Sequence, residues 1–243
     1  FELTTWVDAP PGSGLGSSST LVTAVLGAFV EWLRLPLGEY DLAWLAYRIE
    51  RHDLGYSGGK QDQYAATFGG VNFMEFFRDD KVIVNPLRIR NEILNELAVN
   101  LVLYYTGTSR LSSVIIEKQQ NTIRRGDGDR VEAMHKTRAM ATLMKEALLK
   151  GELTVIGELM HEAWQYKKQM AEGISNPEID AIYEAARQAG ALGGKISGAG
   201  GGGYMFFFCP GNSRYRVIDT LSHFGGEVTP FGFTKSGLTT WVL

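Results

Sequence analysis

The chain has 243 residues, of which 44% are hydrophobic and 21% charged, so it is long enough for one large domain or two packed ones and too apolar for a disordered segment. Its formal net charge of -3, without a concentrated basic face, argues against a nucleic-acid-binding surface. The single cysteine, Cys209, excludes an intrachain disulfide and a thiolate metal site, and it predicts a reducing compartment, the cytoplasm. No apolar stretch approaches the roughly 20 residues that span a bilayer, so no membrane association is expected.

The N-terminal part of the chain predicts a strand, a loop and then helices. Residues 1–9 alternate apolar and polar side chains with a period of two, which indicates a strand that runs directly into the glycine- and serine-rich residues 10–19. Apolar residues at helical spacing predict helices over 21–33 and 40–51. The elements expected next are a short helix at 61–68, a hairpin formed by 71–77 and 81–86, and a buried strand at 97–105.

The remainder of the chain predicts mainly helices, with strands close to its end. Asn176 and Pro177 form a helix-start signal, a capping residue followed by proline at the first helical position. The helices expected are 112–122, 130–150, 153–171, 177–188 and 213–224, and the strands expected are 204–208, 227–232 and 238–243. Because strands and helices are mixed rather than strictly alternating, the fold class expected is α+β.

Residues 10–19, PPGSGLGSSS, have the composition of an anion-binding loop. Glycines let the backbone approach a phosphate, consecutive N–H groups converge on it, and the following helix presents the positive end of its dipole. The P-loop pattern would place a lysine where Ser17 stands, and the dinucleotide-binding pattern would place its third glycine there, so neither fits. A flexible turn between a strand and a helix is the alternative, although such turns seldom contain this many glycines and serines.

Three segments together resemble the signatures of the GHMP kinases, a family of ATP-dependent small-molecule kinases. They are the loop PxGxGLGSSS at residues 10–19, the acidic segment ERHDLGYSGGKQDQ at 50–63 and the loop KISGAGGGG at 195–203. Within the family, the tract from residue 50 and the later YYTGxSR are most similar to bacterial kinases of D-glycero-D-manno-heptose 7-phosphate. Family members begin with a further segment that holds a first signature and much of the sugar pocket, and nothing in this chain corresponds to it.

The resemblance implies a two-domain fold and a reaction. Residues 1–95 are expected to be the remainder of an N-terminal α/β sandwich that binds ATP, and residues 96–243 a C-terminal ferredoxin-like α+β domain. The activity implied is ATP-dependent phosphorylation of the anomeric hydroxyl of a sugar phosphate, with ATP and Mg²⁺ as cofactors. The partners expected are the sugar phosphate and, as one option, a second copy in a homodimer, but neither nucleic acid nor membrane.

Two loops are expected to form the nucleotide site. The first would hold the ATP phosphates through backbone N–H groups, and the resemblance implies that the Ser18 hydroxyl ligates Mg²⁺. The second, residues 198–203, would pack against the first, although a tight turn between strands is the alternative reading. The residues expected to contact ATP are Pro11, Gly12, Ser13, Gly14, Leu15, Gly16, Ser17, Ser18 and Ser19 in the first loop and Gly198, Ala199, Gly200 and Gly201 in the second.

Two carboxylates are the candidate chemical groups. Glu50 suits a second oxygen ligand of Mg²⁺, which takes hard oxygens and usually only one or two carboxylates; the alternative is an exposed glutamate that closes a helix and pairs with a neighbouring cation. The resemblance implies that Asp62 is the catalytic aspartate that receives the proton of the sugar hydroxyl or orients it. The alternative for Asp62 is a helix cap.

Two basic residues complete the candidate site. Lys60 is expected to help neutralise phosphate charge, with a solvated surface position as the equal alternative. Arg110 is expected to bind the distal phosphate of the sugar, because arginine suits bidentate phosphate recognition, with a surface cap as the equal alternative. Other functions kept open are a fucokinase-like, galactokinase-like or mevalonate-type kinase and a non-catalytic nucleotide-binding homologue.

Overall fold

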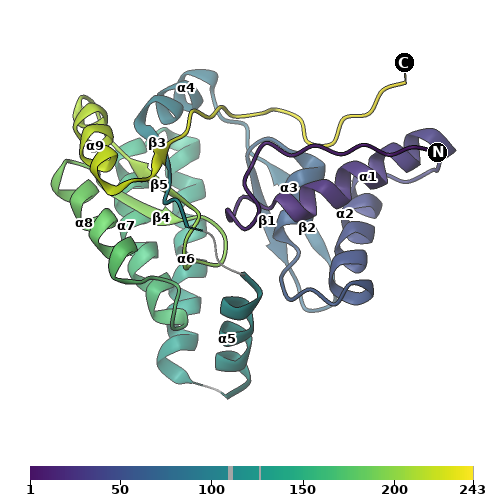
Figure 1. Cartoon of the computed structure of the whole chain (residues 1–243), viewed down its shortest axis with the longest axis horizontal. Helices are drawn as coiled ribbons and strands as arrows, with labels where there is room; N and C mark the ends of the chain where they lie inside the picture. Colours follow the sequence, from purple (N-terminus) through teal and green to yellow (C-terminus); the bar gives the residue numbers. More distant parts are fainter. Residues whose placement is uncertain (109–111, 126, 243) are drawn as a thin grey trace. The chain divides into compact units, whose positions relative to one another are not determined.

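The computed structural model describes residues 1–108, 112–125 and 127–242 of the chain (Figure 1). Tertiary contacts group the chain into two compact units. Unit 1 consists of Phe1–Pro11, Gly16–Leu87 and Phe233–Leu243, and unit 2 consists of Gly12–Leu15 and Arg88–Gly232. The loop at residues 10–19 therefore contributes to both units. The boundary expected between residues 95 and 96 stays a prediction.

Unit 1 is built from helices and a β-hairpin. Its helices are α1 (Ser17–Leu33), α2 (Glu39–Arg48) and α3 (Gln61–Phe68), which pack on one another. The hairpin pairs β1 (Asn72–Phe76) with β2 (Val82–Pro86) in antiparallel register. Its core contains Ala43, Tyr64, Val82 and Val84. These elements confirm the helices and the hairpin that the sequence predicts for this part of the chain.

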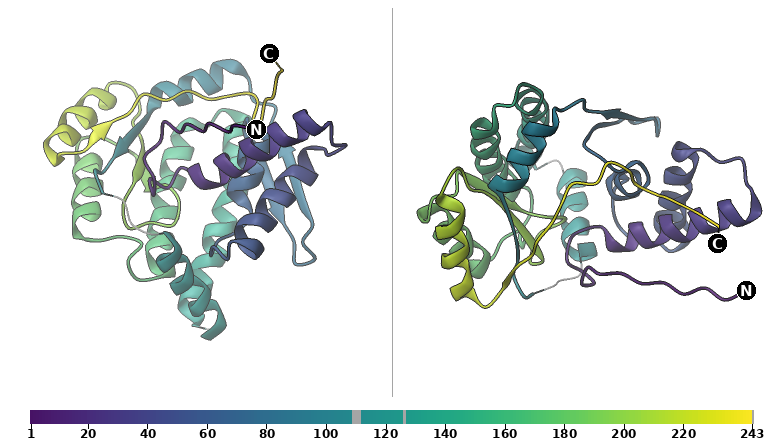
Figure 2. Two further views of the ribbon diagram at one scale, coloured as in Figure 1. Left: turned by 45° about the vertical axis from the view of Figure 1, so that its right-hand side comes forward. Right: turned by 90° about the horizontal axis from the view of Figure 1, so that it is seen from above.

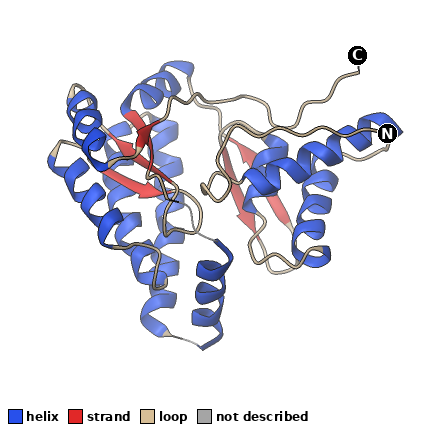
Figure 3. Cartoon of the chain, viewed as in Figure 1, coloured by secondary structure: helices blue, strands red, loops and turns tan. Residues whose placement is uncertain are grey.

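The two terminal segments of unit 1 are extended but do not form the strands that the sequence predicts. Residues 1–9 and 238–242 have no strand assignment and follow loop paths in Figure 3. An alternating pattern becomes a strand only when another strand satisfies its backbone groups, and among the described residues neither segment has such a partner. They are anchored by other contacts: the Phe1 ring lies 5.5 Å from the Phe29 ring, and Leu238 N donates to Thr67 O over 3.0 Å.

Unit 2 contains an antiparallel sheet with the strand order β4-β5-β3-β6. The strands are β3 (Leu101–Tyr105), β4 (Gly193–Ile196), β5 (Tyr204–Phe208) and β6 (Glu227–Val228). Met205 and Phe207 join one buried cluster, and Phe206 and Phe208 join another. Because neighbouring side chains of a strand point to opposite faces, this explains why the run from residue 204 to 208 is apolar throughout.

Helices enclose both clusters of unit 2. They are α4 (Asn91–Asn100), α5 (Ser112–Arg125), α6 (Gly128–Lys150), α7 (Leu153–Met170), α8 (Pro177–Gln188) and α9 (Ser213–Leu221). Helices α6 and α7 run along each other, as both views in Figure 2 show. The predicted start of α8 is confirmed, since the Asn176 side chain accepts from Ile179 N over 2.9 Å and Pro177 occupies the first helical position. Within the described residues, no helix is long and apolar enough to cross a membrane.

Two strands predicted in unit 2 need correction. The first half of the strand predicted at 97–105 belongs to α4, in which Ile93, Leu97 and Asn100 recur at helical spacing on the buried side. The strand predicted at 227–232 is confined to Glu227–Val228. Strand β4, which sequence reasoning missed, contains two glycines and a lysine, a composition with weak strand propensity. The fold class α+β is confirmed.

Strand β4 packs directly against the backbone of α7 through glycine. A Cβ atom on Gly193 would overlap the carbonyl oxygen of Gly157 and lie 2.6 Å from the His161 amide nitrogen, both on α7. These neighbours are backbone atoms, which cannot rotate away as a side chain would. Only a residue without a side chain therefore allows this distance between strand and helix.

We expect the substitution Gly193→Ala to lower the free energy of unfolding by about 1–3 kcal/mol, because the added methyl must push β4 and α7 apart. The matched control is Gly232→Ala in the same unit, where a Cβ would meet no atom within 4 Å and the backbone is not left-handed. Urea denaturation of both variants measures the difference. Equal stability of the two variants would contradict the close packing of β4 on α7.

Candidate active site

The Glu50 carboxylate is the centre of a buried polar cluster in unit 1. The Ser18 hydroxyl donates to Glu50 Oε1 over 2.9 Å, and the Ser19 hydroxyl donates to Glu50 Oε2 over 2.6 Å. The side-chain amide of Gln63 donates to the same Oε2 and also to the Ser19 hydroxyl. Glu50 and Gln63 are fully buried. The structure thus brings together Ser18 and Glu50, the two residues predicted as magnesium ligands.

Local backbone structure places these side chains. Helix α2 ends at Arg48 and continues as a π-helical turn, Ile49–Asp53, that contains Glu50. Turns of this kind occur mostly as single insertions and are frequent at functional sites. Ser18 and Ser19 lie in the first turn of α1, after Gly16 with its left-handed backbone (φ 74°). The free N–H groups of this turn and the helix dipole favour a negative charge beside it.

The Glu50 carboxylate is stabilised by hydrogen bonds from uncharged donors. A buried carboxylate is costly unless hydrogen bonds or a counter-charge compensate it. Among the described residues no ion pair involves Glu50, so the alternative of an exposed glutamate paired with a neighbouring cation is wrong. The described residues also contain no group of three or more His, Cys, Asp or Glu side chains that could hold a metal ion by themselves. One carboxylate beside one hydroxyl suits Mg²⁺, which completes its coordination with phosphates and water.

Asp62 lies beside the first turn of α1. It occupies the first turn of α3, and a Cβ atom built on Gly16 would lie 3.3 Å from the Asp62 carboxyl carbon. Asp62 is an exposed residue, but the protein packed around its carboxyl displaces part of the surrounding water. This desolvation raises the pKa of Asp62 above its ordinary value, the positive charge of Arg51 lowers it, and the negative charge of Glu50 raises it. The N-cap position of α3 is Lys60, and among the described residues no side chain caps this helix, so the cap alternative for Asp62 does not hold.

Lys60 is held away from both carboxylates. Its ammonium pairs with Asp80 and lies over the rings of Trp44 and Tyr47, 4.9 Å and 5.0 Å from their centroids. The side chain is 13% exposed, so the solvated alternative does not describe it, and its expected role beside phosphate stays a prediction. The cation that acts on Asp62 is instead Arg51, whose Nε donates to Gly59 O over 3.2 Å. Sequence reasoning had singled out Lys60 and overlooked Arg51.

The two glycine-rich loops meet backbone to backbone in unit 2, as predicted. The Ser197 hydroxyl donates to Gly14 O over 2.9 Å, and a Cβ on Gly198 would lie 2.9 Å from Gly14 Cα. Tyr204 N donates to Ser13 O over 3.0 Å. Gly14 and Gly198 both have left-handed backbones, with φ of 81° and 66°. Side chains at these two positions would both be strained and separate the loops.

The first loop retains free donors. Among the described residues, no amide of residues 12–16 donates to an acceptor, and the first backbone bond of α1 starts only at Thr20 N, which donates to Gly16 O. The Ser13 hydroxyl is fully buried and also has no partner there. Buried polar groups are normally satisfied, so the unpaired Ser13 hydroxyl marks a place for an acceptor, and the unpaired amides of the exposed Gly12 and Leu15 are open to the same acceptor. The phosphate oxygens of a nucleotide fit this requirement.

The second loop is anchored by a lysine of helix α7. Lys167 Nζ, on α7, donates to Gly198 O over 2.5 Å and to Ile196 O over 3.4 Å. Burial, helped by the nearby charge of Lys195, lowers the pKa of Lys167 to about 7. Gly201 N donates to Ile174 O over 2.9 Å, so this amide is already engaged. The contact between the loops therefore rests on a braced structure.

The structure places the remaining predicted residues as follows. Ala199 packs against a buried cluster of unit 2, and the backbone of Gly200 lies against Ile174. Arg110, predicted for the distal phosphate of the sugar, lies outside the described residues. Sequence reasoning missed Gln63 and Ser197, although both stand inside the segments that resemble the family signatures. Their signal was position: Gln63 follows Asp62, and Ser197 precedes the glycine run.

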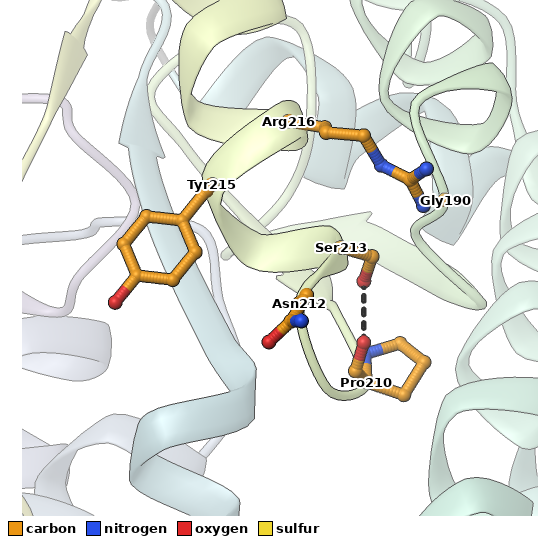
Figure 4. A pocket seen from close by; sticks show the side chains of 6 residues that line it. All are labelled: Gly190, Pro210, Asn212, Ser213, Tyr215 and Arg216. Atoms are coloured by element: carbon orange, nitrogen blue, oxygen red, sulfur yellow. Dashed lines mark hydrogen bonds between the residues drawn. The ribbon is translucent and has the colours of Figure 1, made fainter.

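A surface pocket of about 650 Å³ in unit 2 lies elsewhere (Figure 4). It lies at the N-terminal end of α9, where the Ser213 hydroxyl donates to Pro210 O over 2.8 Å. Tyr215 and Arg216 contribute side chains to its lining. None of the predicted site residues lines it.

Two family models match separate parts of this chain, and a relative matches nearly all of it. The model of the GHMP kinases N terminal domain matches residues 1–70, and the model of the GHMP kinases C terminal domain matches residues 144–227. A D-glycero-alpha-D-manno-heptose 7-phosphate kinase of Campylobacter jejuni is 50% identical over 241 residues, which cover 99% of this chain and 70% of the relative.

Solved structures give the same result. The crystal structure of a D-glycero-D-manno-heptose 1-phosphate kinase from Bacteroides thetaiotaomicron matches with a TM-score of 0.76 and 43% identity over 96% of this chain and 64% of that one. A putative sugar kinase from Campylobacter jejuni matches with a TM-score of 0.76 and 48% identity, over 96% and 66%. The chain thus spans about two thirds of the length of these relatives. With both family domains matched and a relative of 50% identity, the chain belongs to the GHMP kinase family.

Proposed function

We propose that the protein containing this chain is an ATP-dependent kinase that transfers a phosphoryl group to the anomeric hydroxyl of a sugar phosphate. The proposed acceptor is D-glycero-D-manno-heptose 7-phosphate and the product its 1,7-bisphosphate, in the supply of GDP-heptose for surface polysaccharide. The observation that carries the proposal is the hydrogen bond from the exposed Ser18 hydroxyl to the buried Glu50 carboxylate, with Asp62 beside the same helix turn. The names of relatives at 50% and 43% identity support the choice of sugar.

The ATP phosphates are assigned to the first glycine loop. The unpaired amides of residues 12–16, the buried Ser13 hydroxyl and the first turn of α1 are the proposed donors. The second loop, from Gly198 to Gly201, contributes support to the backbone of Gly14. Preorganised donors of this kind stabilise charge on a transferring phosphoryl group.

Ser18 and Glu50 are the proposed ligands of a magnesium ion. Glu50 Oε1 and the Ser18 hydroxyl already lie 2.9 Å apart and are the hard oxygen donors that Mg²⁺ prefers. Magnesium, when bound, neutralises phosphate charge and positions the terminal phosphate for transfer. The Ser18 hydroxyl would turn a lone pair outward, and Glu50 would keep its hydrogen bonds to Ser19 and Gln63.

Asp62 is the proposed proton acceptor. The anomeric oxygen of the sugar forms a bond to the γ-phosphorus, the bond from that phosphorus to the bridging oxygen of ADP breaks, and the hydroxyl proton passes to the Asp62 carboxylate. A raised pKa makes this carboxylate a stronger base than an ordinary aspartate. Little covalent chemistry is required of the protein, because positioning and charge stabilisation dominate such transfers.

The other assignments complete the proposal. Lys60, paired with Asp80, is assigned a role in fixing the start of α3 rather than direct contact with phosphate. Arg110 is kept as the ligand of the distal sugar phosphate. We place the reaction in the cytoplasm, in line with a single cysteine, and keep the homodimer as the proposed assembly.

A panel of acceptors tests the proposed substrate. We expect full-length protein to consume ATP with D-glycero-D-manno-heptose 7-phosphate at a kcat/KM at least tenfold above that for fucose, galactose or mevalonate. A coupled assay for ADP measures all four. A higher kcat/KM for any of the other three would replace the proposed acceptor while leaving the family unchanged.

The substitution Asp62→Asn tests the proposed base. We expect kcat to fall by about 10²–10⁴-fold, because the amide cannot accept the proton, while the affinity for ATP changes less than about twofold. Asp53→Asn is the matched control, an exposed aspartate at the end of the π-helical turn whose side chain has no role in the proposal. Undiminished turnover by the Asp62 variant would remove this residue from its role.

The substitution Arg51→Gln tests the electrostatics around Asp62. If ionised Asp62 is the base, the rate falls as the pH drops through its pKa. Arg51 lowers that pKa, so removing the guanidinium raises it further and moves the acid limb of kcat/KM to higher pH. Arg51→Lys retains the charge and should shift the limb less. An acid limb that stays in place, or moves to lower pH, contradicts the assignment.

A further inference from the structure

Gln63 is a fully buried side chain whose amide faces a carboxylate. It lies on α3 immediately after Asp62, and its Nε2 donates to Ser19 Oγ over 3.1 Å and to Glu50 Oε2. Its Oε1 has no partner among the described residues. Leaving one buried oxygen without a partner costs free energy. We infer that the two N–H groups of Gln63 have a role that outweighs this cost.

The chemistry of the neighbours fixes the orientation of this amide. Glu50 is an acceptor only, so the nitrogen of Gln63 must face it; the opposite orientation would place two oxygens against each other. Ser19 accepts one N–H of Gln63 and donates its own proton to Glu50 Oε2. Three side chains therefore close a ring of hydrogen bonds on one carboxylate oxygen.

The two oxygens of Glu50 consequently differ. Oε2 receives two donors, from Ser19 and Gln63, whereas Oε1 receives one, from Ser18. A carboxylate oxygen that already accepts two hydrogen bonds has no lone pair left for another ligand. Among the described residues Oε1 accepts only the Ser18 hydroxyl, so it retains one lone pair.

We propose that Gln63 is a positioning residue that anchors Glu50 through Oε2, so that Oε1 and the Ser18 hydroxyl are presented together to a divalent cation. The inference rests on the proposed function of Ser18 and Glu50. It also assigns Ser19, predicted among the ATP-binding residues, to the anchoring side of the carboxylate. Partners that orient a metal ligand in this way typically contribute 10–100-fold in metal affinity or activity.

The position of Gln63 on α3 adds a second consequence. Its backbone carbonyl accepts from the Thr67 hydroxyl over 2.8 Å, and the next residue, Tyr64, belongs to the core of unit 1. The helix turn that contains the proposed base Asp62 is thereby fixed to the carboxylate of Glu50. Helix α3 therefore carries Asp62 and, through Gln63, is hydrogen-bonded to Glu50.

The test replaces Gln63 by methionine, which has a similar length but no N–H group. Mn²⁺ serves as the probe, because its binding to full-length protein in the presence of a non-hydrolysable ATP analogue is measured directly by electron paramagnetic resonance. We expect Gln63→Met to weaken Mn²⁺ binding about 10–100-fold and the affinity for the analogue without metal to change less than about twofold. Raising the Mg²⁺ concentration should restore part of the lost kcat/KM.

Thr67→Val is the matched control on the same helix, since it removes a buried hydrogen bond to Gln63 O and leaves the contacts of Glu50 intact. It should bind Mn²⁺ like the wild type. Ser19→Ala, which removes the other donor to Oε2, should weaken Mn²⁺ binding as Gln63→Met does and keeps the test open if the methionine variant does not fold. Thermal melting of each variant establishes folding.

Three results overturn the inference. Wild-type Mn²⁺ affinity in folded Gln63→Met, with affinity lost in Glu50→Gln, removes Gln63 from its role and leaves the proposed metal ligands in place. Wild-type Mn²⁺ affinity in Glu50→Gln as well removes the metal site itself, and both proposals then fall. An equal loss of metal-free nucleotide affinity in Gln63→Met would indicate a structural role only.

Discussion

The burial of one negative charge in unit 1 joins the starts of two helices to a π-helical turn. The Glu50 carboxylate has no cation beside it among the described residues, and a buried unpaired carboxylate costs several kcal/mol. Its compensation requires the start of α1, the π-helical turn after α2 and the first turns of α3 to meet at one point. A cluster that satisfies a charge with neutral donors leaves room for a cation, because the negative charge has not been neutralised.

In unit 2, two glycine-rich loops contact each other through backbone atoms. The contact of Gly14 with Gly198 and of Ser13 with Tyr204 brings two chain segments closer than side chains allow. The amides of the first loop are not used in this contact and stay free for an anion. Lys167 on α7 donates to the backbone of Gly198, and Ser197 donates to the backbone of Gly14, so both side chains fix the second loop. A rigid support and a set of open donors are therefore parts of one arrangement.

The basic residues of unit 1 are distributed by their partners rather than by their order in the chain. Lys60 stands two residues from Asp62, yet its ammonium is retained by Asp80 and two aromatic rings. Arg51 stands eleven residues from Asp62 and acts on its pKa. Asp62 on α3 and Arg51 on the π-helical turn lie close enough to interact, which their spacing in the sequence does not reveal.

The sequence by itself determined the family, the fold class, the hairpin, the start of α8 and the two glycine loops, because each depends on local pattern or on residue types that only one structure needs. It also singled out Ser18 and Glu50, which are hydrogen-bonded to each other, and Asp62, which lies beside Gly16. Only the tertiary structure decided that Gln63 completes the cluster around Glu50, that the charge of Arg51 acts on Asp62, and that, among the described residues, 1–9 and 238–242 remain extended without pairing. These outcomes depend on partners distant in the chain, and a hydrogen bond or a strand pair exists only when both partners are in position.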